Sequence, residues 1–298
     1  MVISQVFETI KSILSARDIE DYEFDSLCIM EDYLHADRMA IAADGGREAD
    51  DAAAERAIAA AQKRAEGYPL QYVLGKWEFF GLPFRVGEGV LIPRPDTEIL
   101  VETVLDYFNS IKCTSPKIVD LCSGSGCISV ALKKHLPEAD VTAVELSSEA
   151  MPYLVENARM NGVVLRYIKG DVMNGAVMEN FADKEDVGEY IKADCIVSNP
   201  PYLTEEEMSD LQTEVGYEPK MALDGGLDGL KFYRVISCLW KTILKDGGLL
   251  AFEAGYMQGQ AVKDIMEKNG FENVRIKKDY GGNDRVIYGF KKPDSEKE

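Results

Sequence analysis

Residues 196–202 read Ile-Val-Ser-Asn-Pro-Pro-Tyr, and this short stretch decides how the rest of the chain is organised. The apolar run that starts at Cys195 is typical of a buried strand. The strand must end at Asn199, because Pro200 and Pro201 have no N–H to donate to a sheet ladder. Pro200 also favours an extended backbone at the residue before it. The sequence therefore predicts a buried strand followed by a stiff loop rich in carbonyl acceptors.

This loop carries the groups needed to bind a planar primary amide or an amino group. Asn199 supplies a side-chain carbonyl and Pro200 a backbone carbonyl, and each can accept one N–H. The ring of Tyr202 would suit a positively charged methyl donor, because aromatic faces attract cations. The other interpretation is an ordinary strand that ends in a proline turn, with Tyr202 as core packing. For these residues alone, the two interpretations are equally well supported.

A second motif, Asp-Leu-Cys-Ser-Gly-Ser-Gly at 120–126, lies upstream at a spacing that a βαβ unit allows. A predicted strand at 117–122 runs into this glycine turn and then into a helix at 128–136. The backbone can therefore approach a ligand closely at the sheet edge. NAD, FAD, a phosphate or S-adenosylmethionine would each fit a lone glycine loop. The third glycine of the dinucleotide fingerprint and the Walker Lys-Ser/Thr pair are both missing.

Acidic residues stand at the ends of three successive predicted strands, at Asp120, Glu145 and Asp171. Glu145 can accept hydrogen bonds from both hydroxyls of a ribose. Asp171 is a candidate for binding an adenine amino group. The three acids in register favour a nucleoside ligand, and the loop at 199–202 makes S-adenosylmethionine the best choice.

Composition limits the functions open to the chain. Its 298 residues suit one large or two modest domains, and 46% hydrophobic residues indicate a globular protein. The net charge of -19 argues against non-specific binding to nucleic acid or anionic membranes and favours a basic protein partner or a small ligand. Six irregularly spaced cysteines and two histidines argue against a zinc site or a disulfide framework. We expect a cytoplasmic protein, because no apolar run approaches ~18 residues and the N-terminus is amphipathic.

Hydrophobic periodicity divides the chain into three parts. Residues 1–75 predict a helical domain, whose composition fits a scaffold or a partner-recognition role equally well. Residues 76–95 predict a β-hairpin linker around Gly81. Strand and helix patterns then alternate through 96–298, which predicts a parallel sheet covered by helices on both faces. The acidic stretch 174–192 is expected to be a partly helical surface insertion, and the charged tail 291–298 is expected to be loose.

With these motifs the chain resembles the HemK/PrmC family of peptide chain release factor N5-glutamine methyltransferases. The resemblance covers nearly all of 64–290, and the helical N-terminus more loosely. Asn-Pro-Pro-Tyr is shared with amino-methylating enzymes in general, whereas the other blocks are more particular to this family. These blocks are Pro-Leu-Gln-Tyr at 69–72 with Gly75, Leu-Ile-Pro-Arg-Pro-Asp-Thr-Glu at 91–98, Glu218-Pro219, Leu-Asp-Gly-Gly at 223–226, Asp-Gly-Leu at 228–230 and Tyr-Gly-Gly-Asn-Asp-Arg at 280–285.

The resemblance implies a class I S-adenosylmethionine-dependent methyltransferase fold, Rossmann-like, with a seven-stranded mostly parallel sheet behind an all-α substrate-recognition domain. The implied substrate is the glutamine of the Gly-Gly-Gln motif in release factors, methylated by a monomer that leaves S-adenosylhomocysteine as product. The implied cofactor-binding residues are Cys122, Ser123, Gly124, Ser125, Gly126, Glu145, Asp171, Val172 and Asn199. The implied substrate-binding residues are Asn199, Pro200, Pro201 and Tyr202, of which Asn199, Pro200 and Tyr202 are the catalytic candidates.

One position departs from the pattern and three other functions remain open. Cys122 stands where many methyltransferases have glycine, which leaves less room at the first turn position.

A ribosomal-protein glutamine methyltransferase shares much of the motif set. A DNA or RNA amino-methyltransferase uses the same loop, but it would need a basic channel that a net charge of -19 does not favour. A non-catalytic S-adenosylmethionine-binding adaptor would not need the intact loop at 199–202.

Overall fold

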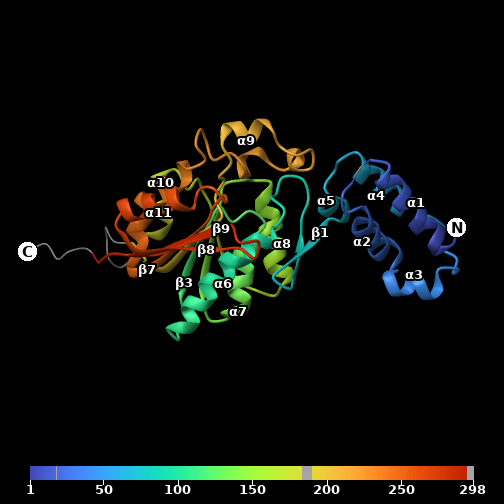
Figure 1. Cartoon of the computed structure of the whole chain (residues 1–298). Coiled ribbons are helices and arrows are strands. Elements are labelled where there is room, and N and C mark those ends of the chain that lie inside the picture. The colour runs from blue at the N-terminus through green and yellow to red at the C-terminus, as the bar shows by residue number, and fades with distance from the viewer. Residues whose placement is uncertain (18, 183–189, 294–298) are drawn as a thin grey trace, which may run out of the picture. The chain divides into compact units, whose positions relative to one another are not determined.

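The computed structural model describes residues 1–17, 19–182 and 190–293 (Figure 1). Within these ranges the chain forms two compact units. The first contains Met1–Lys76 together with Gln212–Tyr217, and the second begins at Trp77 and contains the remainder. The short segment Gln212–Tyr217 is thus separated in sequence from the unit to which it belongs.

The first unit is helical, as predicted. Helix α1 buries one face at helical spacing, through Ile3, Val6, Ile10 and Leu14. Helix α4 starts at Asp50, whose side chain accepts the N–H of Ala53, and it buries a row of alanines that lets neighbouring helices pack closely. The helices of this unit are α1 (Ile3–Ser15), α2 (Tyr22–Leu34), α3 (Arg38–Asp44), α4 (Asp51–Ala65) and α5 (Leu70–Leu74).

A buried arginine joins three parts of this unit. Arg64, near the end of α4, donates from Nε to Asp25 of α2 and from Nη2 to Glu214, both at 2.7 Å. Arg64 is only 5% exposed, and burial raises the pKa of Asp25 above its ordinary value. The ring of Tyr217 lies edge-on to Tyr68 at a centroid distance of 5.1 Å. These contacts anchor the segment Gln212–Tyr217 in the helical unit.

The second unit is built on the predicted seven-stranded sheet. Its strand order is β5-β4-β3-β6-β7-β9-β8; β9 runs antiparallel to both of its neighbours, β7 and β8, and the other pairs are parallel. The mostly parallel sheet is therefore confirmed. The strands are β3 (Lys117–Leu121), β4 (Asp140–Glu145), β5 (Arg166–Lys169), β6 (Ala193–Ser198), β7 (Leu244–Glu253), β8 (Phe271–Lys278) and β9 (Asp284–Lys291).

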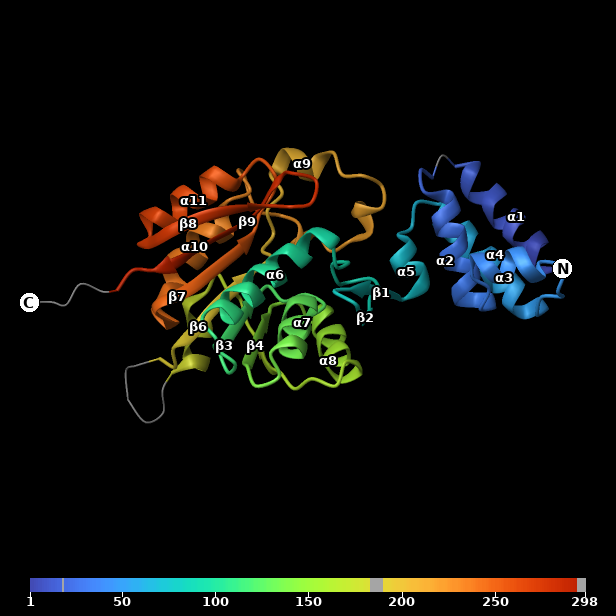
Figure 2. The ribbon, with the colours of Figure 1, turned by 60° about the horizontal axis from the view of Figure 1, so that its bottom comes forward.

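Helices cover both faces of this sheet (Figure 2). In β3, Ile118 packs with α6, α7 and α8, whereas Val119 and Leu121 pack on the opposite face with α10 and α11. The helices and turns of this unit are α6 (Pro95–Ser110), α7 (Cys127–His135), α8 (Ala150–Met160), η1 (Gly175–Phe181), α9 (Glu205–Ser209), η3 (Lys220–Ala222), α10 (Lys231–Leu239), η4 (Trp240–Ile243) and α11 (Gly259–Lys268); η2 (Val215–Tyr217) belongs to the helical unit.

The predicted hairpin is present as β1 (Lys76–Phe79) and β2 (Leu82–Arg85). Its two-residue turn has positive φ at both Phe80 and Gly81, which matches the twist of antiparallel strands. Asn157 of α8 fixes β2, because its side chain accepts the N–H of Arg85 and donates to the carbonyl of the same residue.

Two expectations about irregular segments need correction. In the stretch 174–192, Val177, Met178 and Phe181 are buried, and Phe181 lies edge-on to Trp240 at 5.6 Å. The first half of this insertion is therefore part of the core, because its apolar residues face the helical layer; residues 183–189 lie outside the described residues. Lys291, expected to begin a loose tail, is the last residue of β9, and 294–298 also lie outside the described part.

Other structural features can be stated only for the residues described. Across 1–17, 19–182 and 190–293, no helix has both the length and the apolar character that crossing a membrane requires. Over the same ranges, no group of three or more His, Cys, Asp and Glu side chains is placed to hold a metal ion. All six cysteines carry free thiols.

We predict that Asp25→Ala destabilises the helical unit by about 3 kcal/mol, because it removes one carboxylate from a buried guanidinium. That loss corresponds to roughly hundredfold faster hydrogen exchange at the protected amides of α4, measured in the full chain. Glu31→Ala, on an exposed position of the same helix α2, is the control and should leave exchange nearly unchanged. Equal exchange rates in the two variants would show that the buried ion pair does not stabilise this unit.

Candidate functional site

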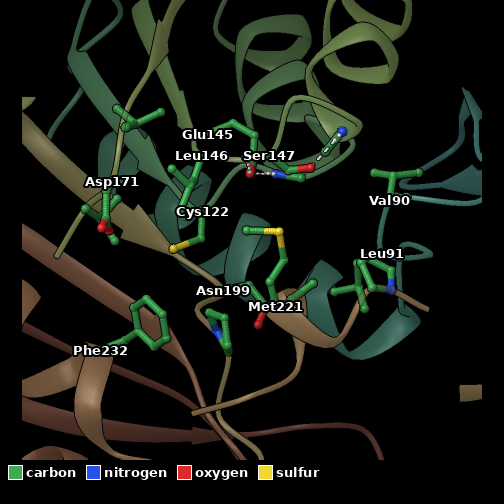
Figure 3. Close-up of a pocket in the computed structure, with 18 of the residues that line it drawn as sticks. Val90, Leu91, Cys122, Glu145, Leu146, Ser147, Asp171, Asn199, Met221 and Phe232 are labelled. Carbon is green, nitrogen blue, oxygen red and sulfur yellow. Dashed lines mark hydrogen bonds between the residues drawn. The ribbon is translucent and has the colours of Figure 1, made fainter. Parts of the chain in front are cut away.

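A cavity opens beside the carboxyl ends of the parallel strands (Figure 3). We call it the sheet-edge cavity. In the sheet, β3 lies between β4 and β6, so the strand order reverses at β3. Open α/β sheets bind ligands at such a switch point. The predicted site residues along the wall of the sheet-edge cavity are Cys122, Gly124, Glu145, Asp171, Val172, Asn199 and Pro201.

The glycine turn between β3 and α7 is built from left-handed residues. Cys122, Gly124 and Gly126 have φ values of 61°, 53° and 79°. A Cβ added at Gly126 would lie 2.2 Å from Leu154 Cδ1, so only glycine fits there. Cys122 adopts the left-handed region although it carries a side chain, which explains physically why glycine is usual at this position. Its thiol faces the cavity, and burial raises its pKa well above the ordinary value, so it stays neutral.

Glu145, the last residue of β4, ties this turn to the next strand. Its Oε2 accepts the N–H of Gly124 and its Oε1 accepts the N–H of Ser147, both at 2.7 Å (Figure 3). The side chain is 8% exposed and lines the cavity. Each carboxylate oxygen keeps a second lone pair, so Glu145 can hold the turn and still accept hydrogen bonds from a ligand.

The structure does not bring Asp120 to the cavity, and the prediction that all three acids face one ligand is wrong for this residue. Asp120 lies two residues after Ile118 and therefore points to the same face, toward α7. Its Oδ2 accepts a hydrogen bond from Ser129 Oγ at 2.5 Å. The carboxyl is fully buried, and desolvation raises its pKa to about 7. Asp120 therefore supports the turn from beneath.

Three further members of the turn shape it without lining the cavity. Ser123 is buried and donates from Oγ to the backbone carbonyl of Asp120 at 2.9 Å. The carbonyl of Ser125 accepts a hydrogen bond from Asn157 Nδ2 at 2.9 Å. Gly126 packs against Leu154.

The end of β5 supplies the next part of the wall. Asp171 is half-buried, and its Oδ1 accepts the N–H of Met173 at 2.9 Å. Val172 is 4% exposed, and its carbonyl accepts a hydrogen bond from Trp240 Nε1 at 2.9 Å. The indole therefore fixes the backbone that carries both wall residues.

The loop after β6 places Asn199 at the cavity (Figure 3). Pro201 also lines it. Asn199 donates from Nδ2 to Thr97 Oγ1 at 3.2 Å. Because the amide nitrogen is held there, Oδ1 is the atom of this side chain that can accept a hydrogen bond from a ligand. Pro200 is buried and does not line the cavity.

Tyr202 also differs from the prediction. Its ring is partly buried against the core cluster beneath α10 and α11 and does not line the cavity. Burial raises the pKa of its phenol well above the ordinary value. Its carbonyl accepts a hydrogen bond from Gln258 Nε2 at 2.8 Å. A Cβ at Gly225 or Gly229 would lie 2.7 or 2.3 Å from backbone atoms of Tyr202, which explains the glycines in two of the sequence blocks.

Sequence reasoning missed that the quoted blocks pair with one another. Arg94 forms an ion pair with Glu218, which is 4% exposed and also accepts the N–H of Ile92 at 3.0 Å. Asp96 lies 2.9 Å from Arg285, in a block almost 190 residues further along the chain. The sequence did contain a signal for this pairing, because a basic residue in one motif has an acidic counterpart in a distant motif. The apolar wall was also missed; it includes Leu91, Leu146, Met221 and Phe232.

Comparison with known proteins identifies the class first. Residues 5–75 match the family described as PrmC N-terminal domain, and residues 95–218 match the family described as Methyltransferase small domain. Together with the seven-stranded sheet, these matches define a class I methyltransferase with a helical N-terminal domain.

Three relatives, each named a release factor glutamine methyltransferase, narrow the assignment. The protein from Geobacter sulfurreducens is 36% identical over 290 residues, which is 96% of each chain. The protein from Clostridium acetobutylicum is 37% identical over 279 residues, covering 93% of this chain and 94% of the relative. The Fusobacterium nucleatum protein is 44% identical over 239 residues, covering 80% of this chain and 63% of the relative. The chain belongs to the release factor glutamine methyltransferase family.

We predict that Cys122→Gly is more stable than Cys122→Ala by about 1 kcal/mol, because only the alanine keeps a Cβ in left-handed backbone. This reverses the usual order, in which alanine is the more stabilising residue. Both variants lack the thiol, so their difference isolates the backbone strain. Denaturant unfolding of the two proteins measures it, and a more stable alanine variant would contradict the assigned strain.

Proposed function

We propose that this protein transfers a methyl group from S-adenosylmethionine to the side-chain amide nitrogen, N5, of the glutamine in the Gly-Gly-Gln motif of a peptide chain release factor. The observation that carries the proposal is the position of Asn199, whose Oδ1 is left as an acceptor at the sheet-edge cavity. The names of the relatives support the release factor as substrate. When bound, S-adenosylmethionine supplies an electrophilic methyl group on a sulfonium.

The residues around the sheet-edge cavity fit this cofactor. Glu145 provides carboxylate acceptors for ribose hydroxyls, and Asp171 provides one for the adenine amino group. Val172 and Phe232 offer apolar surface to a purine. We therefore assign cofactor contacts to Cys122, Gly124, Glu145, Asp171, Val172 and Asn199, whereas Ser123, Ser125 and Gly126 hold the turn that carries them.

The chemistry proposed for the loop is orientation. An amide nitrogen is a poor nucleophile because its lone pair is delocalised into the carbonyl. Asn199 Oδ1 would accept one N–H of the substrate glutamine at the cavity. The backbone carbonyl of Pro200, a residue buried next to the cavity lining, is the acceptor we propose for the other N–H, and together they would fix the direction of the nitrogen. The same acceptors stabilise the positive charge that appears on nitrogen as the new bond forms. Pro201 and Tyr202 keep this loop in place, and the proton leaves to solvent after transfer.

No titrating base is required by this scheme. Neither His35 nor His135 lines the sheet-edge cavity, and His135 Nδ1 lies 3.0 Å from the carbonyl of Ala131 within α7. A primary amide carries no proton that must leave before its nitrogen attacks. Positioned acceptors can therefore provide the catalysis.

We assign recognition of the release factor to the helical domain at 1–75. The chain that leaves the Asn-Pro-Pro-Tyr loop contributes Gln212–Tyr217 to this unit, where Glu214 binds Arg64. The net charge of -19 favours a protein substrate over DNA or RNA.

Mass spectrometry tests the proposed function. A release factor is incubated with the protein and S-adenosylmethionine, and we expect one added methyl group on the Gly-Gly-Gln glutamine. The same release factor with that glutamine replaced by alanine is the matched control. A methyl group on another residue, or on a ribosomal protein alone, would overturn the assignment.

We predict that Asn199→Ala lowers kcat by ~10²-fold or more, because it removes one oriented acceptor. Its affinity for S-adenosylhomocysteine, measured by calorimetry, should stay within a few-fold of the parent value, since the other wall residues remain. Asn269→Ala, at the end of α11 and outside the cavity lining, is the control and should retain full activity. Normal turnover by the Asn199 variant would remove the proposed mechanism.

We also predict that kcat/KM for the release factor falls as salt is added. The net charge of -19 would attract a basic partner, and added ions screen that attraction. Affinity for S-adenosylhomocysteine serves as the internal control, because a small ligand in a cavity is affected less. A kcat/KM that is independent of salt would show that charge does not guide the encounter.

A further inference from the structure

Two buried polar side chains stand directly behind Asn199. Thr97, in the first turn of α6, is 2% exposed and accepts the hydrogen bond from Asn199 Nδ2 at 3.2 Å. The carboxyl of Glu253, the last residue of β7, is 1% exposed, and the nearby Thr97 hydroxyl lowers its pKa. The three residues come from three different elements, and Thr97 is the one that contacts Asn199.

We propose that Thr97 and Glu253 are positioning residues that fix the side-chain amide of Asn199, so that its carbonyl oxygen is presented to the reacting glutamine. The proposal rests on the proposed function and adds to it the residues that orient the acceptor. Neither Thr97 nor Glu253 lines the sheet-edge cavity. Both therefore act through Asn199.

The donor count gives the Asn199–Thr97 hydrogen bond its direction. A threonine hydroxyl carries a single hydrogen, and an ionised carboxylate can only accept. The ionised form of Glu253 therefore attracts the hydroxyl hydrogen of Thr97, which leaves a lone pair for Asn199 Nδ2. A flipped amide would place Oδ1 against the Thr97 oxygen, and one buried hydrogen bond would be lost. Such a loss costs about 1–3 kcal/mol, which is enough to keep one orientation dominant.

The buried position of Glu253 lowers the stability of the folded protein. Its Oε2 is buried and has no hydrogen-bond partner in the part of the chain that the structure describes, so the residue carries a desolvation penalty. Desolvation raises the pKa of Glu253 to about 7, while Thr97, Arg285 and Arg94 act in the opposite direction and Asp96 adds to the rise. A core selected for stability alone would not keep a carboxyl with an unpaired oxygen there, which favours a functional reason for its position.

The surrounding ion pairs hold Thr97 in place. Arg94 and Asp96, just before it in the chain, are paired with Glu218 and Arg285 respectively. Arg285 also lies 3.1 Å from Asp279 and donates to the carbonyl of Ala254 at 3.3 Å, directly after Glu253. Arg285 thus connects the first turn of α6 to the end of β7, and the Arg94–Glu218 pair fixes the residue that caps this helix.

The decisive comparison is Thr97→Val against Thr97→Ser in the full-length protein. Valine keeps the size but removes the hydroxyl, so we expect kcat to fall roughly 10- to 100-fold as the amide loses its fixed orientation. KM for the release factor and affinity for S-adenosylhomocysteine should change little. Serine restores the hydroxyl and should restore most of kcat. Glu253→Gln, which can donate as well as accept, should lie between the parent protein and the valine variant.

Thr103→Val is the matched control, because Thr103 is also a buried threonine of α6 and its hydroxyl bonds only the carbonyl of Ile99 in its own helix. It should keep full kcat. If it loses as much activity as Thr97→Val at equal unfolding free energy, the positioning role is overturned. Equal kcat in the valine and serine variants at position 97 overturns it as well.

A readout independent of activity separates this proposal from the proposed function. In protein labelled with ¹⁵N-asparagine, the Asn199 side-chain NH₂ should show slow hydrogen exchange in the parent and serine proteins and fast exchange in Thr97→Val. If the parent protein methylates no release factor but this pattern holds, the proposed function fails and the fixed orientation stands. If exchange is the same in all three proteins, the positioning proposal fails regardless of activity.

Discussion

The site depends on the point at which β6 must stop. Pro200 and Pro201 cannot donate to a ladder, so the strand ends at Ser198, where it still pairs with Leu121 of β3 and Phe252 of β7. This register brings the residues that follow β3 and β6, and the last residue of β7, to the same edge of the sheet. One residue more or less would turn each of these side chains to the opposite face.

The alternation of side chains along each strand then decides which side chains meet. Val197 and Ala251 pack on the face covered by α6 and α7, and so the residues two positions later, Asn199 and Glu253, point toward α6. The first turn of α6 supplies Thr97 between them. The sequence blocks that carry the family resemblance are therefore brought together by the sheet, and their opposite charges pair because the strands align them.

The parts that sequence predicted correctly are those governed by local periodicity. Alternating strand and helix patterns gave the parallel sheet, and the aromatic runs around Gly81 gave the hairpin. The side-chain direction of Asp120 was not predictable in this way, because it depends on which residue ends β3. The burial of Tyr202 depends on Gly225 and Gly229 approaching its backbone, and the pairing of Arg64 with Glu214 joins residues far apart in sequence. Such long-range contacts leave no periodic signal.

The two fully buried carboxyls of the sheet edge follow the same design. Asp120 accepts a hydrogen bond from Ser129, the third residue of α7, and the pKa of Glu253 is lowered by the hydroxyl of Thr97, the third residue of α6. Among the described residues, one oxygen of each carboxyl has no hydrogen-bond partner, and burial raises both pKa values to about 7. A hydroxyl that donates its hydrogen toward the core keeps its lone pairs for the side that faces away from the core. It can therefore orient a neighbouring polar group without carrying charge. An enzyme that must orient a neutral amide needs such fixed dipoles more than it needs a titrating base.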